Sequence, residues 1–296
     1  MGIKNLSKII KKLAPSGVSE ICMENLRGKT LCIDVPIFMY KFTYIDPENP
    51  IKCFQLQLST MKQFDITPIY IFDGVAATIK TPELEKRRNL KRKAKDDLED
   101  ASQKLAKVKE TSKDITANFA NLADAHTQFE KAKKKVISVP SAQSYVKLRE
   151  YFTENNIKWM QAPHDAEKLA ANLVSSGVAY GVVSEDFDTM PYFCGSKGDD
   201  GRLITGFTKP VMTMYRLQPI LNQLQMDKYK FVDFCILSGC DLCSKIKNIA
   251  GRRAVTLIQA HGSIERIIRV IDNNKYQVPE NFDYNAARKE FGVLKD

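Results

Sequence analysis

Three short apolar runs stand out along the chain, and each leads into an acidic residue. They are TLCID at 30–34, PIYIFDG at 68–74 and VAYGVVSED at 178–186. Each run is rich in β-branched or aromatic residues and is followed by polar residues or turn formers, as expected of buried strands. Helical patterns separate the runs, at 51–65, 141–155 and 165–176. Strands that alternate with helices predict an α/β fold with a mostly parallel sheet.

Residues 80–138 have a different pattern, rich in Lys, Arg, Glu and Ala with few large apolar side chains. This composition favours helix, but it leaves only a thin apolar stripe. Within it, KRRNLKRKAK at 86–95 contains no acidic residue, and Lys80 and Arg87 are seven residues apart on one helix face. One interpretation is a helical segment that is exposed to solvent or forms a coiled coil. The other is a charged helical insertion that binds a polyanion. The same cluster also fits a nuclear localisation signal.

The last third of the chain, 215–272, predicts helices with a turn at 248–251 and another at 261–263. Arg252 and Arg253 follow the first turn and open the next helix. Backbone N–H groups at a helix start, together with nearby cations, can hold a phosphate. A plain helix–turn–helix packing unit is the alternative. No internal repeat is evident.

Charge and cysteine usage narrow the class of protein. The 296 residues carry a formal net charge of +10, which favours a nucleic acid partner over an anionic membrane or a merely basic surface. No apolar stretch is long enough to span a membrane, and the N-terminus lacks a signal-peptide core. The seven cysteines include Cys235, Cys240 and Cys243, but no second ligand pair for zinc. Reduced core cysteines in an intracellular protein are therefore favoured.

Acidic residues at strand ends and helix starts are the main candidates for chemistry. The seven acids in question are Asp34, Asp73, Asp165, Glu167, Asp186, Asp188 and Asp241. Taken singly, each has a structural explanation, such as a favourable position in the first turn of a helix or simple capping. Their number and placement make a shared role the better hypothesis.

Taken together, these acids predict a metal site. The carboxyl ends of neighbouring parallel strands meet at one edge of a sheet. Two carboxylates ~4 Å apart repel each other by about 4 kcal/mol at an effective dielectric constant near 20. Oxygen ligands without His or Cys suit Mg²⁺ or Mn²⁺, and a pair of such ions serves phosphoryl transfer. A basic protein with one acidic pocket has the charge pattern of a nuclease.

At this point the sequence resembles a known family, the flap endonucleases, which are structure-specific 5′ nucleases that include XPG-type and exonuclease members. The likeness covers nearly the whole chain and rests on motifs in order. They are MGIKNLSKII at the N-terminus, LCID, YIFDG, APHDAEKLAA, SEDFDTM, and FVDFCILSGCD followed by IKNIAGRRAVTLI. The resemblance implies a PIN-like 5′ nuclease fold with a central, mostly parallel sheet, a helical arch and a C-terminal helix-hairpin-helix element.

The resemblance also implies roles for particular residues. The seven acids correspond to the carboxylates that hold two metal ions, with Asp34, Asp73 and Asp186 central to catalysis. Lys80 and Arg87 resemble the basic pair of the arch that contacts the scissile phosphate. Tyr40 resembles an aromatic residue that stacks on the nucleotide beside the cut. The alternative for Tyr40 is packing in the core. The further residues expected to bind DNA are Gly2, Arg88, Lys91, Arg92, Lys247, Gly251, Arg252 and Arg253.

Two motifs depart from the family pattern. The third motif usually reads Glu-Ala-Glu, whereas this chain has Asp165 first, one methylene shorter, so that this ligand can act through water. The hairpin usually reads Gly-Ile-Gly, whereas this chain has Asn248-Ile249-Ala250 followed by Gly251. Ala adopts left-handed backbone poorly, which weakens the expectation that K⁺ binds at this turn. The Gln-x-x-Leu-x-x-Phe-Phe tail that docks cellular members on the sliding clamp is not found. A compact, diverged member is implied, and a large DNA virus is one candidate source.

The sequence thus predicts a single 5′ nuclease domain over 1–296. Its parts are a motif region at 1–79, the arch insertion at 80–138, a second motif region with the hairpin at 139–272, and a tail at 273–296. We expect a monomeric, Mg²⁺-dependent 5′ flap endonuclease acting on flap, nicked or branched DNA in replication, repair or recombination, with Mn²⁺ as a substitute metal. A 5′–3′ exonuclease or gap or junction endonuclease, a similar RNA-degrading PIN nuclease, and a non-catalytic DNA-binding scaffold are the alternatives. The expected location is the nucleus, or a cytoplasmic viral replication site.

Overall fold

The chain forms two compact units in a computed structural model that describes residues 3, 5–75, 81–110, 115–137, 139–198, 201–272 and 274–293. The first unit comprises Met1–Phe38, Gln55–Lys80 and Tyr151–Asp296, and the second comprises Met39–Phe54 and Thr81–Glu150. The predicted insertion at 80–138 therefore lies almost wholly in the second unit. Among the described residues, no helix has the length and apolarity needed to cross a membrane.

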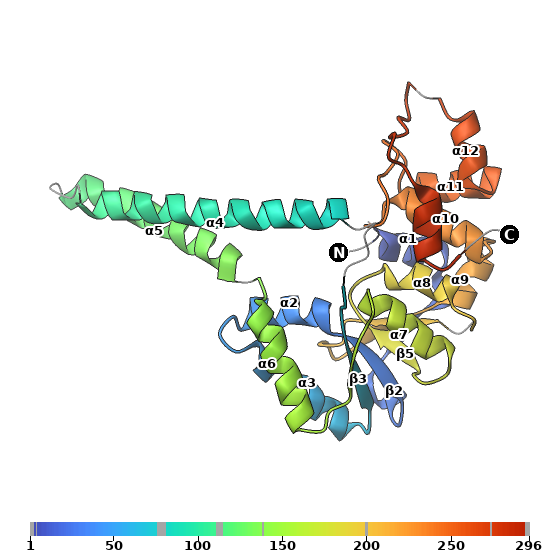
Figure 1. The fold of residues 1–296 in the computed structure, drawn as a ribbon, viewed down its shortest axis with the longest axis horizontal. Helices are drawn as coiled ribbons and strands as arrows, with labels where there is room; N and C mark the ends of the chain where they lie inside the picture. The colour runs from blue at the N-terminus through green and yellow to red at the C-terminus, as the bar shows by residue number, and fades with distance from the viewer. Residues whose placement is uncertain are drawn as a thin grey trace. The chain divides into compact units, whose positions relative to one another are not determined.

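The first unit is built on a seven-stranded sheet with the order β1-β7-β6-β5-β2-β3-β4. Figure 1 labels three of its strands, β2, β3 and β5. The strands are β1 (Val18–Ile21), β2 (Thr30–Asp34), β3 (Thr67–Phe72), β4 (Trp159–Gln161), β5 (Gly181–Val183), β6 (Arg202–Thr205) and β7 (Met212–Arg216). The five strands from β6 to β4 run parallel, whereas β7 pairs antiparallel with both β6 and β1. The predicted α/β fold with a mostly parallel sheet is thus confirmed.

The three predicted strands are present as β2, β3 and β5, but β5 is much shorter than the run at 178–186. It ends at Val183 because the residues after it form a side-chain-stabilised turn. Four strands were not predicted, namely β1, β4, β6 and β7. Two of them form the antiparallel edge, which a pattern of alternating strands and helices does not reveal.

Helices and two short 3₁₀ segments connect the strands. In chain order the described elements are α1 (Leu6–Leu13), η1 (Pro15–Gly17), η2 (Met23–Leu26), α2 (Val35–Ile45), α3 (Pro50–Gln63), α4 (Thr81–Glu110), α5 (Ile115–Ile137), α6 (Ala142–Glu154), α7 (Ala166–Ser175), α8 (Thr189–Gly195), α9 (Leu217–Leu224), α10 (Lys228–Ser238), α11 (Arg252–His261), α12 (Ile264–Val270) and α13 (Tyr284–Glu290). The predicted helices at 51–65, 141–155 and 165–176 correspond to α3, α6 and α7, and the expected helical C-terminal third is also present.

Both faces of the sheet are buried in the first unit. On one face, Cys32, Ile69 and Val182 belong to a large apolar cluster with side chains of α1 and α7 to α12. On the other face, Tyr70 of β3 donates a hydrogen bond to Gln57 of α3 at 3.2 Å and stacks on Phe152. Alternate residues of one strand therefore face opposite cores, which is why these strands appear in the sequence as continuous apolar runs.

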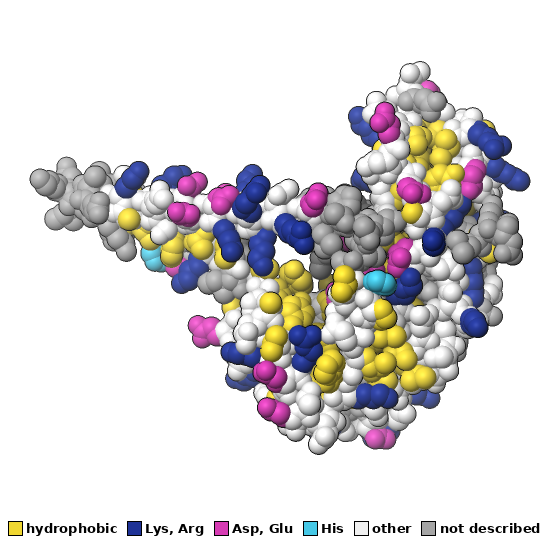
Figure 2. Space-filling view, in the orientation of Figure 1, with side chains coloured by type: hydrophobic (Ala, Val, Ile, Leu, Met, Phe, Trp, Pro, Cys, Tyr) yellow, Lys and Arg dark blue, Asp and Glu magenta, His cyan; other side chains and the backbone are white. Residues whose placement is uncertain are grey.

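The second unit contains the paired helices α4 and α5. Small apolar side chains are buried along their contact, namely Ala101, Leu105, Ala125 and Ala132. Lys, Arg, Asp and Glu side chains are spread along the visible surface of the pair, with some hydrophobic side chains between them (Figure 2). The thin apolar stripe in the sequence is thus used for helix pairing.

Candidate active site

Three neighbouring parallel strands bring acidic residues to one edge of the sheet. In the sheet, β5 lies beside β2, and β2 lies beside β3. Asp34 is the last residue of β2, Asp73 follows β3 directly, and Asp186 lies three residues beyond β5. The strands align in register, with Ile33 opposite Val183 and Asp34 opposite Ile71. These acids therefore gather where the sequence predicted an acidic pocket.

Asp34 is the most deeply buried of these acids, with 1% of its surface exposed. Its Oδ2 accepts a 2.5 Å hydrogen bond from the hydroxyl of Ser184, and its Oδ1 accepts one from the N–H of Ile37 at 3.5 Å. Burial raises the pKa of Asp34 to about 7, and repulsion from Asp73 and Asp186 adds to this rise against the opposing hydrogen bonds. Negative charge is therefore costly at this point unless a cation offsets it.

The turn after β5 is organised by side chains. The Ser184 hydroxyl that donates to Asp34 also accepts from the N–H of Asp186 at 2.9 Å. Asp186 Oδ1 in turn accepts from the N–H of Asp188 at 3.0 Å. Glu185 points elsewhere, because its Oε1 accepts from the N–H of Gly206 at 3.0 Å. Asp186 and Asp188 are thus linked by hydrogen bonds within the turn, whereas Glu185 accepts from Gly206 instead.

The loop after β3 is joined tightly to the loop after β4. The N–H of Gly74 donates to the carbonyl of His164 at 2.6 Å, and the N–H of Ala166 donates to Asp73 Oδ1 at 2.9 Å. A Cβ atom at position 74 would collide with the carbonyl oxygens of Ala162 and Pro163. Glycine in YIFDG is therefore required by this close approach, which holds Asp73 near the start of α7.

Asp165 and Glu167 lie at that helix start. Asp165 is 7% exposed, and its Oδ2 accepts a 2.6 Å hydrogen bond from the hydroxyl of Tyr192 in α8. Glu167 is partly buried in the first turn of α7. Its neighbour Lys168 forms a 2.8 Å ion pair with Glu290 of α13. Asp165 is thus held by a side chain from α8, and the first turn of α7 is tied to α13 through Lys168.

Asp241 follows α10 after Gly239, which adopts a φ of 96°. Burial raises the pKa of the neighbouring Cys240 thiol, and the charges of Asp188 and Asp241 add to that rise. Asp188 and Asp241 therefore approach the same thiol from different segments.

Cys235 and Cys240 are buried and Cys243 is partly buried, and all seven cysteines are free thiols.

The donor set fits a hard divalent cation, because it offers carboxylate oxygens without His or Cys. Within the described ranges, no group of three or more His, Cys, Asp or Glu side chains is arranged to hold a metal ion. Mg²⁺ commonly keeps several of its waters and uses only one or two carboxylates of a protein. The repulsion of Asp34 by Asp73 and Asp186 is the structural feature that such a cation would relieve.

The residues expected to bind DNA fall into three groups. Tyr40 of α2 is 43% exposed, and Arg88, Lys91 and Arg92 of α4 are exposed along one helix. These four side chains are accessible to a ligand. Lys247, Arg252 and Arg253 are exposed in the hairpin region, with Gly251 partly buried. Gly2 and Lys80 lie outside the described residues, as does the side chain of Arg87.

The hairpin between α10 and α11 uses positive φ at Asn248 (64°) and Gly251 (57°). Ala250 does not adopt a positive φ, so the poor tolerance of Ala for left-handed backbone has no consequence at this turn. Arg253 Nη1 donates to the carbonyl of Asn248 at 2.7 Å, and its guanidinium lies over the ring of Tyr276 at 5.7 Å. Arg253 thus braces the turn in addition to offering charge at the surface.

A basic groove that was not predicted lies on the first unit. It has a volume of about 680 Å³ and runs between α1, the turn after β5 and the β6–β7 connection. Lys8, Lys11 and Lys209 line it, together with Phe187. Lys8 and Lys11 are three residues apart on one helix face, a spacing that the sequence contained. Lys209 lies in the connection between β6 and β7, an antiparallel pair that the sequence did not predict.

Two family models match the chain, the XPG N-terminal domain over residues 1–94 and the XPG I-region over residues 156–241. Flap endonuclease 1 of Glycine max is 30% identical over 306 residues, which cover 98% of this chain and 74% of that protein. Among solved structures, the catalytic core of Rad2 with a DNA substrate aligns with a TM-score of 0.66 and 15% identity, covering 100% of this chain and 82% of that one.

A further solved structure, the Holliday junction-resolving enzyme GEN1 with product DNA and Mg²⁺, aligns with a TM-score of 0.58 and 17% identity over 97% of this chain and 64% of that one. These structural likenesses concern the fold. The family matches cover the strand-end acids, the turn after β5 and the start of α7 described above. The chain belongs to the XPG-type flap endonuclease family of structure-specific 5′ nucleases.

Proposed function

We propose that this protein hydrolyses DNA phosphodiesters at 5′ flaps, using two divalent cations held at the carboxyl edge of the sheet. The observation that carries the proposal is the convergence of acidic residues from the ends of β2, β3 and β5. The relatedness to Flap endonuclease 1 of Glycine max supports the substrate class. The net charge of +10 supports binding to a polyanion.

Mg²⁺ is the cation we propose, with Mn²⁺ as a substitute. The oxygen-only donor set supports this choice, as does the presence of Mg²⁺ in the GEN1 structure. The proposed ligands are Asp34, Asp73, Asp165, Glu167, Asp186, Asp188 and Asp241. When bound, the two ions would activate a water molecule for in-line attack and stabilise charge on the leaving oxygen.

The chain's own groups would bind and orient the substrate. Asp34 is fixed by the hydroxyl of Ser184, and Asp73 is fixed by the N–H of Ala166. Such fixed carboxylates lose little conformational freedom when a cation binds. We further propose that Lys80 and Arg87 neutralise charge on the scissile phosphate and that Tyr40 stacks on the adjacent nucleotide.

The DNA backbone would be held by basic surfaces without reading sequence. The basic groove offers Lys8, Lys11 and Lys209 for this purpose. The hairpin offers Lys247, Arg252 and the first backbone N–H groups of α11, with K⁺ as a proposed ion at its turn. We expect the protein to act as a monomer in the nucleus, or at a viral replication site if the chain is viral.

Cleavage of a 5′-labelled double-flap DNA, with and without Mg²⁺, tests the proposal. A nicked duplex and a single strand of the same sequence serve as matched substrates. The expected result is one incision near the flap junction that requires the metal. A ladder of short products from the nicked duplex would instead assign a 5′–3′ exonuclease.

The remaining alternatives give different outcomes in the same experiment. Incision of a gapped or four-way junction in preference to the flap would assign a junction endonuclease. Binding of every DNA without cutting in either Mg²⁺ or Mn²⁺ would refute the enzymatic proposal and favour a scaffold. Binding is measured in parallel by fluorescence anisotropy so that the two functions are separated.

A further inference from the structure

Tyr192 contacts a proposed metal ligand from outside the ligand set. Its hydroxyl lies 2.6 Å from Asp165 Oδ2, and the two residues come from different helices, α8 and the start of α7. Tyr192 is 3% exposed and Asp165 is 7% exposed. A hydrogen bond between a buried hydroxyl and a carboxylate is short and strong, and it leaves the carboxylate little freedom to rotate.

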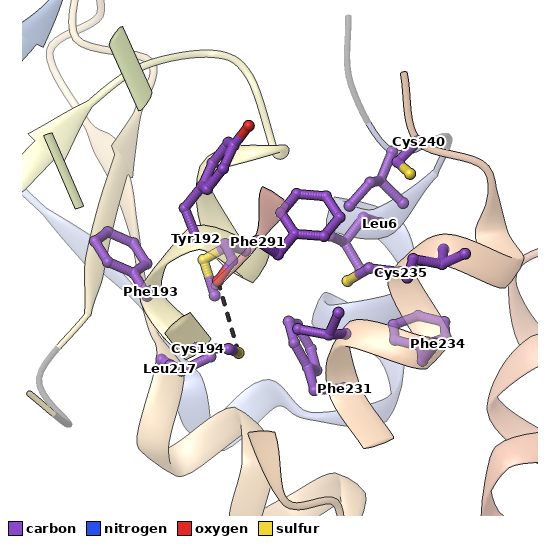
Figure 3. Close-up of a cluster of buried hydrophobic side chains, with 14 of the residues drawn as sticks. Leu6, Tyr192, Phe193, Cys194, Leu217, Phe231, Phe234, Cys235, Cys240 and Phe291 are labelled. Atoms are coloured by element: carbon purple, nitrogen blue, oxygen red, sulfur yellow. Dashed lines mark hydrogen bonds between the residues drawn. The ribbon is translucent and has the colours of Figure 1, made fainter. Parts of the chain in front are cut away.

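The ring of Tyr192 is itself held in place. It packs edge to face against Phe291, with ring centroids 5.0 Å apart and planes at 66°. Figure 3 shows the two rings side by side, with the Tyr192 hydroxyl at the margin of the apolar cluster. Gly195, one turn further along α8, packs so closely that a Cβ there would collide with the carbonyl of Phe291. The hydroxyl therefore has a fixed position relative to Asp165.

The direction of this hydrogen bond is also fixed. A tyrosine hydroxyl ordinarily has a pKa of about 10. The hydroxyl therefore keeps its proton throughout the pH range in which a nuclease is assayed. A protonated hydroxyl facing a carboxylate donates to it. One lone pair of Oδ2 is thus occupied, and the plane of the carboxylate is set by a group that is not a cation ligand.

We propose that Tyr192 is a positioning residue that fixes the Asp165 carboxylate for cation binding. This inference rests on the proposed function, because Asp165 matters here as a cation ligand. Side chains that hydrogen-bond to metal ligands typically change metal affinity by about 10–100-fold when removed. A purely structural tyrosine at the same place would change stability and leave cation affinity unaltered.

The test measures Mn²⁺ binding to the DNA-free full-length chain by electron paramagnetic resonance of the free ion, beside Mg²⁺-dependent flap cleavage. Tyr192→Phe keeps the ring on Phe291 and removes only the hydroxyl. Its matched control is Tyr70→Phe, which removes another buried hydroxyl that donates to Gln57 and not to a carboxylate. We expect Tyr192→Phe to weaken Mn²⁺ binding by roughly tenfold, and to raise the Mg²⁺ concentration for half-maximal cleavage by a similar factor. The rate at saturating Mg²⁺ should stay near that of the wild type.

A second background sharpens the test. Asp165→Glu adds a methylene, which moves the carboxylate away from the position where it accepts the hydrogen bond of the Tyr192 hydroxyl. Adding Tyr192→Phe to Asp165→Glu should therefore change Mn²⁺ affinity far less than it does in the wild-type background. An equal loss in both backgrounds would overturn the inference, as would an equal loss in Tyr70→Phe.

The failure of this inference can be told from the failure of the proposed function. A wild-type protein that binds Mn²⁺ and cuts flap DNA, with Tyr192→Phe indistinguishable from it, would overturn the positioning role alone. A wild-type protein that neither binds Mn²⁺ nor cuts DNA would overturn the proposed function and this inference with it. Circular dichroism of each variant establishes that the fold is retained before binding is compared.

Discussion

Replacing Arg288 by Met should destabilise the first unit strongly. Arg288 of α13 is 6% exposed. Its guanidinium donates two hydrogen bonds to Asp233 of α10, from Nε to Oδ1 and from Nη2 to Oδ2, each at 2.6 Å. It also donates to Glu265 of α12 at 2.5 Å. Asp233 Oδ2 further accepts from the N–H of Ile264 at 3.1 Å. One side chain therefore ties three helices together.

The magnitude follows from what the substitution leaves behind. Met keeps most of the apolar stem of Arg288 but removes the charge, so that Asp233, only 2% exposed, loses both guanidinium hydrogen bonds. Burial already raises the pKa of Asp233 even with Arg288 present, which indicates that the carboxylate is poorly solvated. Removing one partner of a buried ion pair costs about 3–5 kcal/mol. We expect a loss of that size in the free energy of unfolding at pH 7.

Urea unfolding at pH 7 measures this loss. Trp159 of β4 is the single tryptophan of the chain. Its ring centroid lies 5.5 Å from that of Phe72 in β3, so its fluorescence reports on the sheet of the first unit. Arg266→Met is the matched control, because Arg266 is exposed on α12 and its substitution should change stability by less than about 0.5 kcal/mol. A loss of less than about 1 kcal/mol in the free energy of unfolding of Arg288→Met would refute the reasoning. The buried ion pair would then contribute no more than an exposed surface ion pair.

Three further predictions concern charge. Asp186→Asn keeps an oxygen that can accept from the N–H of Asp188 but removes the negative charge, so it should abolish Mg²⁺-dependent flap cleavage while flap affinity, measured by anisotropy, stays near wild type; retained cleavage would exclude Asp186 from the site. Glu265→Gln should reduce acid sensitivity, because Arg288 lowers the pKa of Glu265 from 4.5 to about 2. That stabilisation is present above pH 4.5 and is lost as pH falls towards 2. Since the Glu265 side chain is one-third exposed, we expect only about 1–2 kcal/mol from it in urea titrations at pH 7 and pH 2.5, and equal acid losses in both proteins would contradict this. Lys8→Ala with Lys11→Ala should lower the slope of log affinity against log salt by about 0.9 for each duplex phosphate that the protein no longer neutralises, whereas an unchanged slope would place the DNA elsewhere.

The strand-end acids could be predicted because two local signals agree. Continuous apolar runs identify strands buried on both faces, and such strands belong to parallel sheets whose carboxyl ends share one edge. Asp34, Asp73 and Asp186 follow from this without knowledge of any contact. The order of β5, β2 and β3 in the sheet was the step that the sequence left open, and the structure supplies it.

The short strands could not be predicted, for physical reasons. Trp159–Gln161 in β4 has three residues, too few for a periodic pattern to be distinguished from a loop. The antiparallel β7 is stabilised on both sides by β1 and β6, and its pairing with β1 joins residues nearly 200 positions apart. In β5 the error was one of length, because the hydroxyl of Ser184 accepts from the N–H of Asp186, a backbone donor that a longer strand could have used in the sheet.

The side chains that hold the candidate ligands were missed for a related reason. Ser184 donates to a carboxylate 150 positions away, and Tyr192 donates to one 27 positions away. Ser184 and Asp34 each lie one residue past the paired Val183 and Ile33, but the sequence did not reveal that β5 pairs with β2. The spacing of Tyr192 and Asp165 corresponds to no helix turn or strand pair, so the sequence connected neither donor with its acceptor. A hydroxyl beside an acid in sequence is also common in caps and turns, which hides the rare hydroxyl that serves a distant acid. A ligand set can therefore be proposed from residue types and strand ends, whereas the groups that fix its geometry become identifiable only when the packing of separate helices is known.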